Sequence, residues 1–302
     1  MHGYYGFHNS HFYISIRAFS ACAGVDCALR PPAPWCLITG GVIDLVEVMT
    51  KLYKGDCLDL LPSIPDESID MILCDLPYGT TRASWDKKID PTLLWEQYRR
   101  IIKPHGCIAL FAMLPFSIDL IEPARYLFRY EWVWKKTLPV GFLNANRMPL
   151  RAHENILIFY KHLPKYYPQK WQSTKYKTFG YSQTTLYCRH GPHATESLDG
   201  MRYPVDVVTF SNDIQKGKRT HPTEKPLALL EYMIKTYTDP GDTVLDNAIG
   251  TGGTGIAAAR LDRKFIGIEK DEEFFHTALS RIVDEVGAVK CSCDYARTVA
   301  DL

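Results

Sequence analysis

A strand, a glycine-rich turn, a helix and a second strand follow one another near the end of this 302-residue chain. Thr243–Asp246 predicts a short buried strand, and Phe265–Glu269 predicts the second strand, which ends in an acid. The turn carries three glycines in the spacing of a nucleotide-binding fingerprint, namely Gly250, Gly252 and Gly255. Such glycines let the backbone approach a ligand, and Glu269 can accept hydrogen bonds from ribose hydroxyls. The unit predicts an α/β fold that binds a nucleoside.

The carboxylate that ends the first strand narrows the choice of ligand. Asp246 stands directly before the glycine-rich turn, where it would repel a pyrophosphate but could accept a hydrogen bond from an ammonium group. S-adenosylmethionine has an amino-acid tail and no phosphate, so this position favours it over a dinucleotide. A nicotinamide-dependent oxidoreductase is the alternative from another functional class.

The position of this unit constrains the topology. Only 33 residues follow Glu269, too few for the remaining strands of such a sheet, so those strands must come from the amino-terminal half. Further strands are predicted at 52–54, 69–73, 107–111, 130–134 and 152–160, and helices at 91–102, 117–126, 226–237 and 272–285. Strands that alternate with helices indicate a mostly parallel sheet. We therefore predict a Rossmann-like, circularly permuted α/β fold.

A polar tetrad, Asp75-Leu76-Pro77-Tyr78, follows the apolar run 69–73. Ligands bind at the carboxyl ends of strands in such sheets. Pro77 biases Leu76 toward extended backbone, so the Leu76 carbonyl is held in one direction. Two fixed acceptors beside the Tyr78 ring suit a planar ring with an amino group, such as an adenine or cytosine turned out of a duplex. The alternative is a strand that ends in a proline turn with a solvated Asp.

Basic charge is concentrated in residues 161–220, which hold ten Lys or Arg and four Asp or Glu, whereas the whole chain has a net charge of +1. Aromatic residues are interleaved with this charge, among them Tyr166, Tyr167, Trp171, Tyr176, Phe179, Tyr181 and Tyr187. The mixture is typical of phosphate contacts combined with stacking, and predicts an inserted nucleic-acid recognition region. A solvated insertion with locally packed tyrosines is the alternative.

The domain boundaries predicted from these patterns are a main α/β domain at 49–286 that contains the insertion at about 161–220, a partly disordered amino-terminal extension at 1–48, and a tail at 287–302. No apolar stretch reaches the roughly 18 residues that span a bilayer. Nine cysteines without a disulfide-like spacing are typical of a reducing compartment. Cys188, His190 and His193 lack a partner cysteine pair, so no metal site is predicted. We expect a cytoplasmic protein.

The order of three motifs carries a family resemblance. The tetrad, the basic region, the sequence His221-Pro222-Thr223-Glu224-Lys225-Pro226 and the segment 246–255 resemble the β-group amino-methyltransferases of DNA, particularly the small phage-type adenine enzymes. The resemblance covers about residues 49–285. It implies S-adenosylmethionine as cofactor, double-stranded DNA as partner, base flipping, a restriction–modification setting and a possible homodimer.

The resemblance also implies residue roles. Asp75 and the Leu76 carbonyl would hold the target amino group, with Pro77 between them and Tyr78 stacked on the base. The cofactor site would be formed by Asp246, Gly250, Gly252, Thr254 and Glu269, with Thr223 and Lys225 near its methionine end. Asp56 would contact the cofactor adenine or cap a helix. Hydrogen bonds to Asp75 and Leu76 would localise the lone pair of the amino nitrogen for attack, without a covalent enzyme intermediate.

Two departures from the family pattern and three rival interpretations remain. Leu76 replaces a proline but still supplies a carbonyl, whereas Asn247-Ala248 replaces Pro-Phe and removes an apolar wall of the cofactor pocket. Cytosine enzymes of the family often have Ser in place of Asp75, which favours adenine. An amino-methyltransferase of cytosine, an amino-methyltransferase of RNA and a catalytically silent DNA-binding module are the alternatives.

Overall fold

A nine-stranded sheet forms the centre of the molecule in the computed structural model, which describes residues 12–20, 46–79, 86–180, 193–211 and 224–290. Its strands are β1 (Phe12–Ser20), β2 (Val46–Lys54), β3 (Ile69–Cys74), β4 (Ile102–Ala112), β5 (Phe128–Val140), β6 (Arg151–Phe159), β11 (Val207–Phe210), β12 (Thr243–Asp246) and β13 (Lys264–Glu269). They lie in the order β1-β2-β13-β12-β3-β4-β6-β5-β11. The five neighbouring strands β2, β13, β12, β3 and β4 pair in parallel, and so do β5 and β11. The other pairs are antiparallel: β1 with β2, β4 with β6, and β5 with β6.

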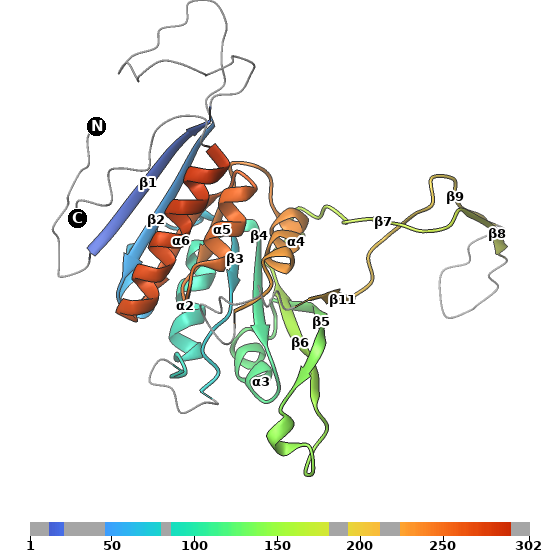
Figure 1. The fold of residues 1–302 in the computed structure, drawn as a ribbon, viewed down its shortest axis with the longest axis horizontal. Coiled ribbons are helices and arrows are strands. Elements are labelled where there is room, and N and C mark those ends of the chain that lie inside the picture. Colours follow the sequence, from blue (N-terminus) through green and yellow to red (C-terminus); the bar gives the residue numbers. More distant parts are fainter. Residues whose placement is uncertain (1–11, 21–45, 80–85, 181–192, 212–223, 291–302) are drawn as a thin grey trace, which may run out of the picture.

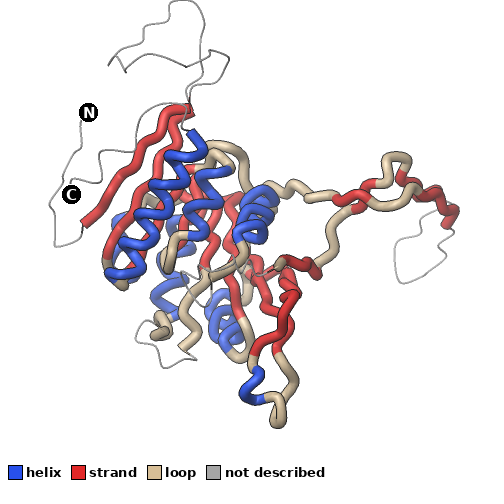
Figure 2. Tube along the Cα trace, viewed as in Figure 1, coloured by secondary structure: helices blue, strands red, loops and turns tan. Residues whose placement is uncertain are grey.

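Helices cover both faces of this sheet (Figures 1 and 2). They are α1 (Cys57–Leu60), α2 (Pro91–Ile101), α3 (Phe116–Ile121), α4 (Leu227–Tyr237), α5 (Gly253–Arg260) and α6 (Glu272–Lys290), with short 3-10 turns η1 (Leu61–Ser63), η2 (Glu122–Ala124) and η3 (Phe142–Asn144). One core lies under α4, α5 and α6 and the other under α1, α2 and α3. Met71 and Leu73 of β3 enter the first core, and Ile72 and Cys74 enter the second. A strand covered on both faces has no polar face, which explains the apolar run at 71–74.

The predicted α/β fold is confirmed, and so is the expectation that both halves of the chain build one sheet. The late strands β12 and β13 lie between the early strands β2 and β3. The end of β12 and the end of β3 therefore point the same way and lie side by side, with Val244 opposite Met71 and Leu245 opposite Ile72. Circular permutation relative to other enzymes stays a prediction.

Two strands of the main sheet, β1 and β11, come from segments that the sequence placed outside the central α/β unit. Residues 1–48 were expected to lie outside the main domain, yet β1 pairs with the full length of β2. Residues 207–210 were assigned to the basic insertion, yet β11 pairs with β5 in the main sheet. Both are strands at or near a sheet edge, and their pairing depends on partners distant in sequence.

Within the basic region, the described residues 171–180 and 193–202 form an arm that extends away from the sheet (Figure 1). It consists of two antiparallel ribbons, one of β7 (Trp171–Gln172) with β10 (Met201–Arg202) and the other of β8 (Tyr176–Gly180) with β9 (His193–Ser197). Among the described residues, no helix is long and apolar enough to cross a membrane.

Candidate active site

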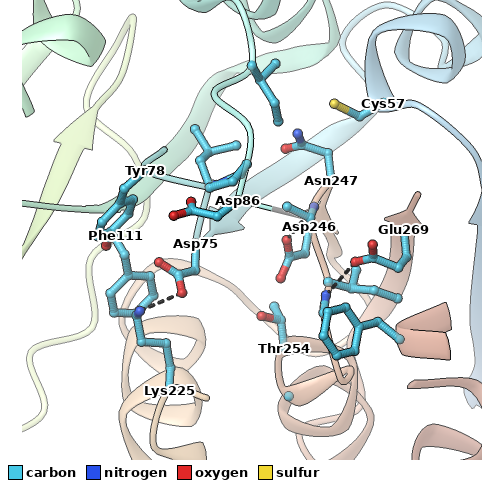
Figure 3. Close-up of a pocket in the computed structure, with 18 of the residues that line it drawn as sticks. Cys57, Asp75, Tyr78, Asp86, Phe111, Lys225, Asp246, Asn247, Thr254 and Glu269 are labelled. Atoms are coloured by element: carbon cyan, nitrogen blue, oxygen red, sulfur yellow. Dashed lines mark hydrogen bonds and ion pairs between the residues drawn. The ribbon is translucent and has the colours of Figure 1, made fainter. Parts of the chain in front are cut away.

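A cavity of about 790 Å³ opens where β3 and β12 end, and most of the predicted site residues line it (Figure 3). Asp75 directly follows β3 and Asp246 ends β12, so the two parallel strands bring both carboxylates to one place. The predicted residues in the wall are Asp56, Asp75, Leu76, Pro77, Tyr78, Lys225, Asp246, Gly250, Thr254 and Glu269. The tetrad and the glycine-rich turn, far apart in sequence, therefore form a single site.

Asp75 presents one engaged and one open oxygen. Its Oδ2 atom accepts a hydrogen bond from Lys225 Nζ at 2.5 Å. Its Oδ1 atom is buried and has no hydrogen bond of good geometry to a described residue, although the Tyr78 hydroxyl lies close enough to the carboxylate to lower its pKa. Burial raises the pKa of Asp75, and the positive charge of Lys225 opposes that rise. A fixed carboxylate with a free buried acceptor suits a donor group that enters with a substrate.

Aromatic rings stand beside this acceptor. Tyr78 lies with its ring centroid 5.0 Å from that of Phe116, and Phe111 forms another part of the wall. The Lys225 ammonium lies 5.1 Å from the Phe111 ring centroid and 5.9 Å from that of Tyr78. The acceptor side thus combines a hydrogen-bonding edge with flat apolar surfaces, as recognition of a single base requires.

A chain of buried charges holds Lys225. Lys225 Nζ lies 3.2 Å from Glu154 Oε2, and the other oxygen of Glu154 accepts a hydrogen bond from Lys136. All three side chains are less than one-tenth exposed. Burial alone would raise the pKa of Glu154, but the two lysines hold it below its ordinary value. Glu154 therefore stays charged and helps to keep Lys225 aimed at Asp75.

The cofactor side contains two further buried carboxylates. Asp246 Oδ1 accepts from the Ala248 backbone N–H at 3.1 Å, and burial raises its pKa to about 6. Glu269 accepts from the Gly250 and Asp271 backbone N–H groups, each at 2.8 Å, and burial raises its pKa to about 7. Gly250 has φ +52°, a conformation that side chains rarely adopt. Glu269 thus fixes the glycine-rich turn while facing the cavity.

Asp56 caps a helix and also lines the cavity. Its Oδ1 accepts from the Leu58 N–H at 3.0 Å and caps α1, which confirms the helix-cap interpretation. Its Oδ2 pairs with Lys270 Nζ at 2.8 Å. The residue also lines the cavity, which keeps it available for a ligand.

Gly252 does not face the cavity, contrary to the sequence expectation. It precedes α5 with φ +86°, and a Cβ there would lie 3.0 Å from the Ala278 Cβ of α6. Gly255 is closer still to its neighbours, since a Cβ would meet Ile282 at 2.5 Å and Phe265 at 2.8 Å. Gly252 and Gly255 thus allow α5 to pack tightly, whereas Gly250 and the adjacent Gly253 line the cavity. Thr223 lies outside the described residues.

Several site residues escaped sequence reasoning. Lys136 comes from β5 and Glu154 from β6. Asp86 Oδ1 accepts a hydrogen bond from the Gly79 N–H at 2.7 Å and so fixes the backbone just after the tetrad. Glu154 lies among the polar residues Arg151, His153 and Asn155 in the first half of β6, so no local signal distinguished it. Asn247 accepts a hydrogen bond from the buried Tyr98 hydroxyl, a long-range contact with no local signal.

The geometry defines a nucleoside-binding α/β enzyme whose cofactor pocket adjoins an acceptor pocket for an amino group. Residues 69–280 match the model of the DNA methylase family of N6/N4 amino-methyltransferases. The chain therefore belongs to this family and is an S-adenosylmethionine-dependent amino-methyltransferase of DNA.

Individual relatives agree. The chain is 28% identical over 264 residues to the Type II methyltransferase M.HinfI of Haemophilus influenzae, covering 78% of this chain and 69% of the relative. It is 28% identical over 252 residues to the Type II methyltransferase M.HpaI of Haemophilus parainfluenzae, with 78% and 74% covered. The crystal structure of an M1.HpyAVI–SAM complex superposes with a TM-score of 0.52 at 25% identity, covering 76% of this chain and 98% of that one. The PvuII cytosine-N4-specific DNA methyltransferase has the same fold, with a TM-score of 0.54 at 18% identity and coverage of 80% and 92%.

The cavity suits S-adenosylmethionine. Asp246 and Glu269 offer carboxylates to a positively charged ligand with ribose hydroxyls, and the turn at Gly250 leaves backbone without a side chain beside them. Ala248 lines the wall where the family commonly has Phe, while Phe274 supplies an aromatic side chain to the same cavity. The cofactor implied by the sequence is thus compatible with the residues present.

The two raised pKa values predict that cofactor affinity depends on pH. Below about pH 6, Asp246 (pKa about 6) and Glu269 (pKa about 7) are mostly neutral and attract a cationic ligand less. We expect the Kd for S-adenosylmethionine, measured by calorimetry without DNA, to rise about tenfold as the pH falls from about 7.5 to about 5.5. Glu269→Gln should remove the part of this dependence near pH 7. An equal Kd at both pH values in the unmutated protein would contradict the assignment.

Proposed function

We propose that the protein methylates the exocyclic amino nitrogen of adenine at one short sequence in double-stranded DNA, acting on a base turned out of the helix. The observation that carries this proposal is the open, buried Oδ1 of Asp75 beside aromatic walls and next to the cofactor pocket. An amino group inside a duplex cannot reach a recessed acceptor, so the target base has to leave the stack.

Bound S-adenosylmethionine supplies an activated methyl group on its sulfonium sulfur. Asp75 and the Leu76 carbonyl accept hydrogen bonds from the two protons of the amino group, which favours a nitrogen with a localised lone pair. Lys225 holds the second oxygen of Asp75, so the carboxylate need not reorient when the base arrives. Tyr78 supplies the aromatic surface against which the base lies.

Adenine rather than cytosine is supported by Asp75 itself. Cytosine enzymes of the family often carry Ser at this position. Here the residue is an aspartate that pairs with Lys225, and Lys225 in turn pairs with Glu154. The likeness to the PvuII cytosine enzyme concerns the fold alone. The narrower resemblance to small phage-type adenine enzymes and the possible homodimer stay predictions.

Sequence recognition is assigned to the arm, through its described residues 170–180 and 193–206. Arg202 stacks over Tyr176 at 4.2 Å and Lys170 over Tyr203 at 4.4 Å, so cationic and aromatic groups gather on it as expected for a DNA-contacting surface. Lys165 belongs to the same basic region by sequence but pairs with Asp239 and Asp242 of the main body. That residue therefore serves packing, and the recognition surface is shorter than the predicted 161–220.

Mapping of the modified positions tests this proposal. Unmethylated plasmid DNA is incubated with the protein and S-adenosylmethionine and then sequenced by a method that detects methylated bases. We expect methylation at adenines within one short sequence. Methylation at cytosines would overturn the base assignment, and scattered methylation would overturn site specificity.

A further inference from the structure

We propose that the tip of the β5–β6 hairpin, residues 141–150, enters the DNA duplex beside the target base pair and fills the space that the departing base leaves. This inference rests on the proposed turning-out of the base. It assigns a DNA-contacting role to a segment outside the basic region 161–220.

The tip is apolar and exposed. Phe142 is 80% exposed and Leu143 is 97% exposed, and Met148 and Leu150 are also more than one-third exposed. Every residue from 142 to 150 is exposed, and the hairpin projects from the sheet in Figure 1. Large apolar side chains gathered on one projecting element mark an interaction site.

The tip has an ordered backbone. The Asn144 N–H donates to the Gly141 carbonyl at 2.9 Å, and the Arg147 and Met148 N–H groups donate to the Asn144 carbonyl at 2.8 and 3.0 Å. These bonds form the turn η3 and its continuation. Phe142 and Leu143 are thus presented on a preformed turn, which reduces the entropy lost on binding.

The hairpin continues the wall of the active-site cavity. Val140 and Arg151 face each other where the hairpin leaves the sheet, and both line the cavity. Further along the same two strands, Lys136 and Glu154 belong to the charge chain behind Asp75. A duplex that delivers a base to Asp75 consequently has to lie against this hairpin.

Charge identifies DNA as the occupant. Residues 135–153 contain four Lys or Arg and no Asp or Glu, namely Lys135, Lys136, Arg147 and Arg151. Lys136 is buried with Glu154, which leaves Arg147 in the tip and Arg151 and Lys135 on the strands that lead to it. Apolar wedges flanked by cations are the means by which proteins separate stacked base pairs, because the cations hold the phosphates while the wedge replaces the lost stacking.

The test compares wild type with a Phe142→Ala, Leu143→Ala double variant on a duplex that contains the recognition sequence mapped with the wild-type protein. Two quantities are measured: kcat/KM for methyl transfer, and the fluorescence gain of an analogue such as 2-aminopurine placed at the target position. Leu163→Ala, a comparably exposed leucine beyond the other end of β6, is the control. S-adenosylmethionine binding and thermal stability are measured for all three proteins.

We expect the double variant to bind the cofactor as wild type does but to lose about tenfold or more in kcat/KM and most of the fluorescence gain, a loss of the size that a missing base-stacking contact produces. Leu163→Ala should match wild type. Wild-type values for the double variant would overturn the inference. Reduced transfer with an undiminished fluorescence gain would also overturn it, because the tip would then act after the base has left. Failure of wild type to methylate DNA would instead overturn the proposed function.

Discussion

Asp75→Ala is expected to lower kcat for methyl transfer by about 10²–10³-fold, the range found when one fixed hydrogen-bonding group is removed from a transition-state site. The alanine removes the open Oδ1 acceptor and leaves Lys225 beside the amino group of the base, where a cation repels developing positive charge. The measurement is single-turnover transfer of labelled methyl groups to unmethylated DNA.

Asp75→Asn is the matched variant. It preserves the size of the side chain and a carbonyl oxygen but loses the negative charge, so transfer should be intermediate between wild type and Asp75→Ala. Calorimetric binding of S-adenosylmethionine is the control and should stay within a few-fold of wild type, because Asp75 belongs to the acceptor side. Activity of Asp75→Ala close to wild type would contradict the role of this carboxylate.

Glu154→Gln is expected to destabilise the fold by about 3–5 kcal/mol and to reduce transfer as well. The substitution leaves Lys136 without its acid inside the protein and removes one of the two carboxylates that hold Lys225. In the folded variant, the buried lysine charges lack the carboxylate that compensated for their removal from water, so the folded state is less stable than in wild type. The free energy of unfolding is measured by urea titration.

An exposed ion pair provides the comparison. Lys88 and Asp119 are joined at 2.8 Å but are both more than one-third exposed, so Asp119→Asn should cost about 1 kcal/mol or less. Equal losses in the two variants would show that burial of the Glu154 cluster has no energetic consequence. Stability lost without any change in kcat would show that Glu154 is structural and does not position Lys225.

Local patterns predicted the central part of the fold. The glycine fingerprint between β12 and β13, with Asp246 and Glu269 at the strand ends, located the cofactor half, and the tetrad after β3 located the acceptor half. Both signals are local because strand ends and tight turns require particular residues at fixed spacing. Their meeting in one cavity also followed, since parallel strands of one sheet end at the same edge.

Contacts between distant segments were harder to predict. The edge strands β1 and β11 depend on hydrogen bonds to partners far along the chain, and nothing in their own residues specifies that pairing. Glu154 and Lys136 become site residues only because β5 and β6 pair beside β4. Gly252 was predicted to line the cofactor site but packs against α6. Glycines of this fingerprint either allow a ligand to approach or allow helices to pack closely, and the sequence does not show which glycine does which.

Nucleoside analysis after transfer of labelled methyl groups to unmethylated duplex DNA tests the central claim most directly. The protein and labelled S-adenosylmethionine are incubated with the DNA, which is then digested and separated into its nucleosides. We predict label in N6-methyldeoxyadenosine with wild type and almost none with Asp75→Ala. Label in N4-methyldeoxycytidine, or no label from a protein that still binds the cofactor, would contradict the account.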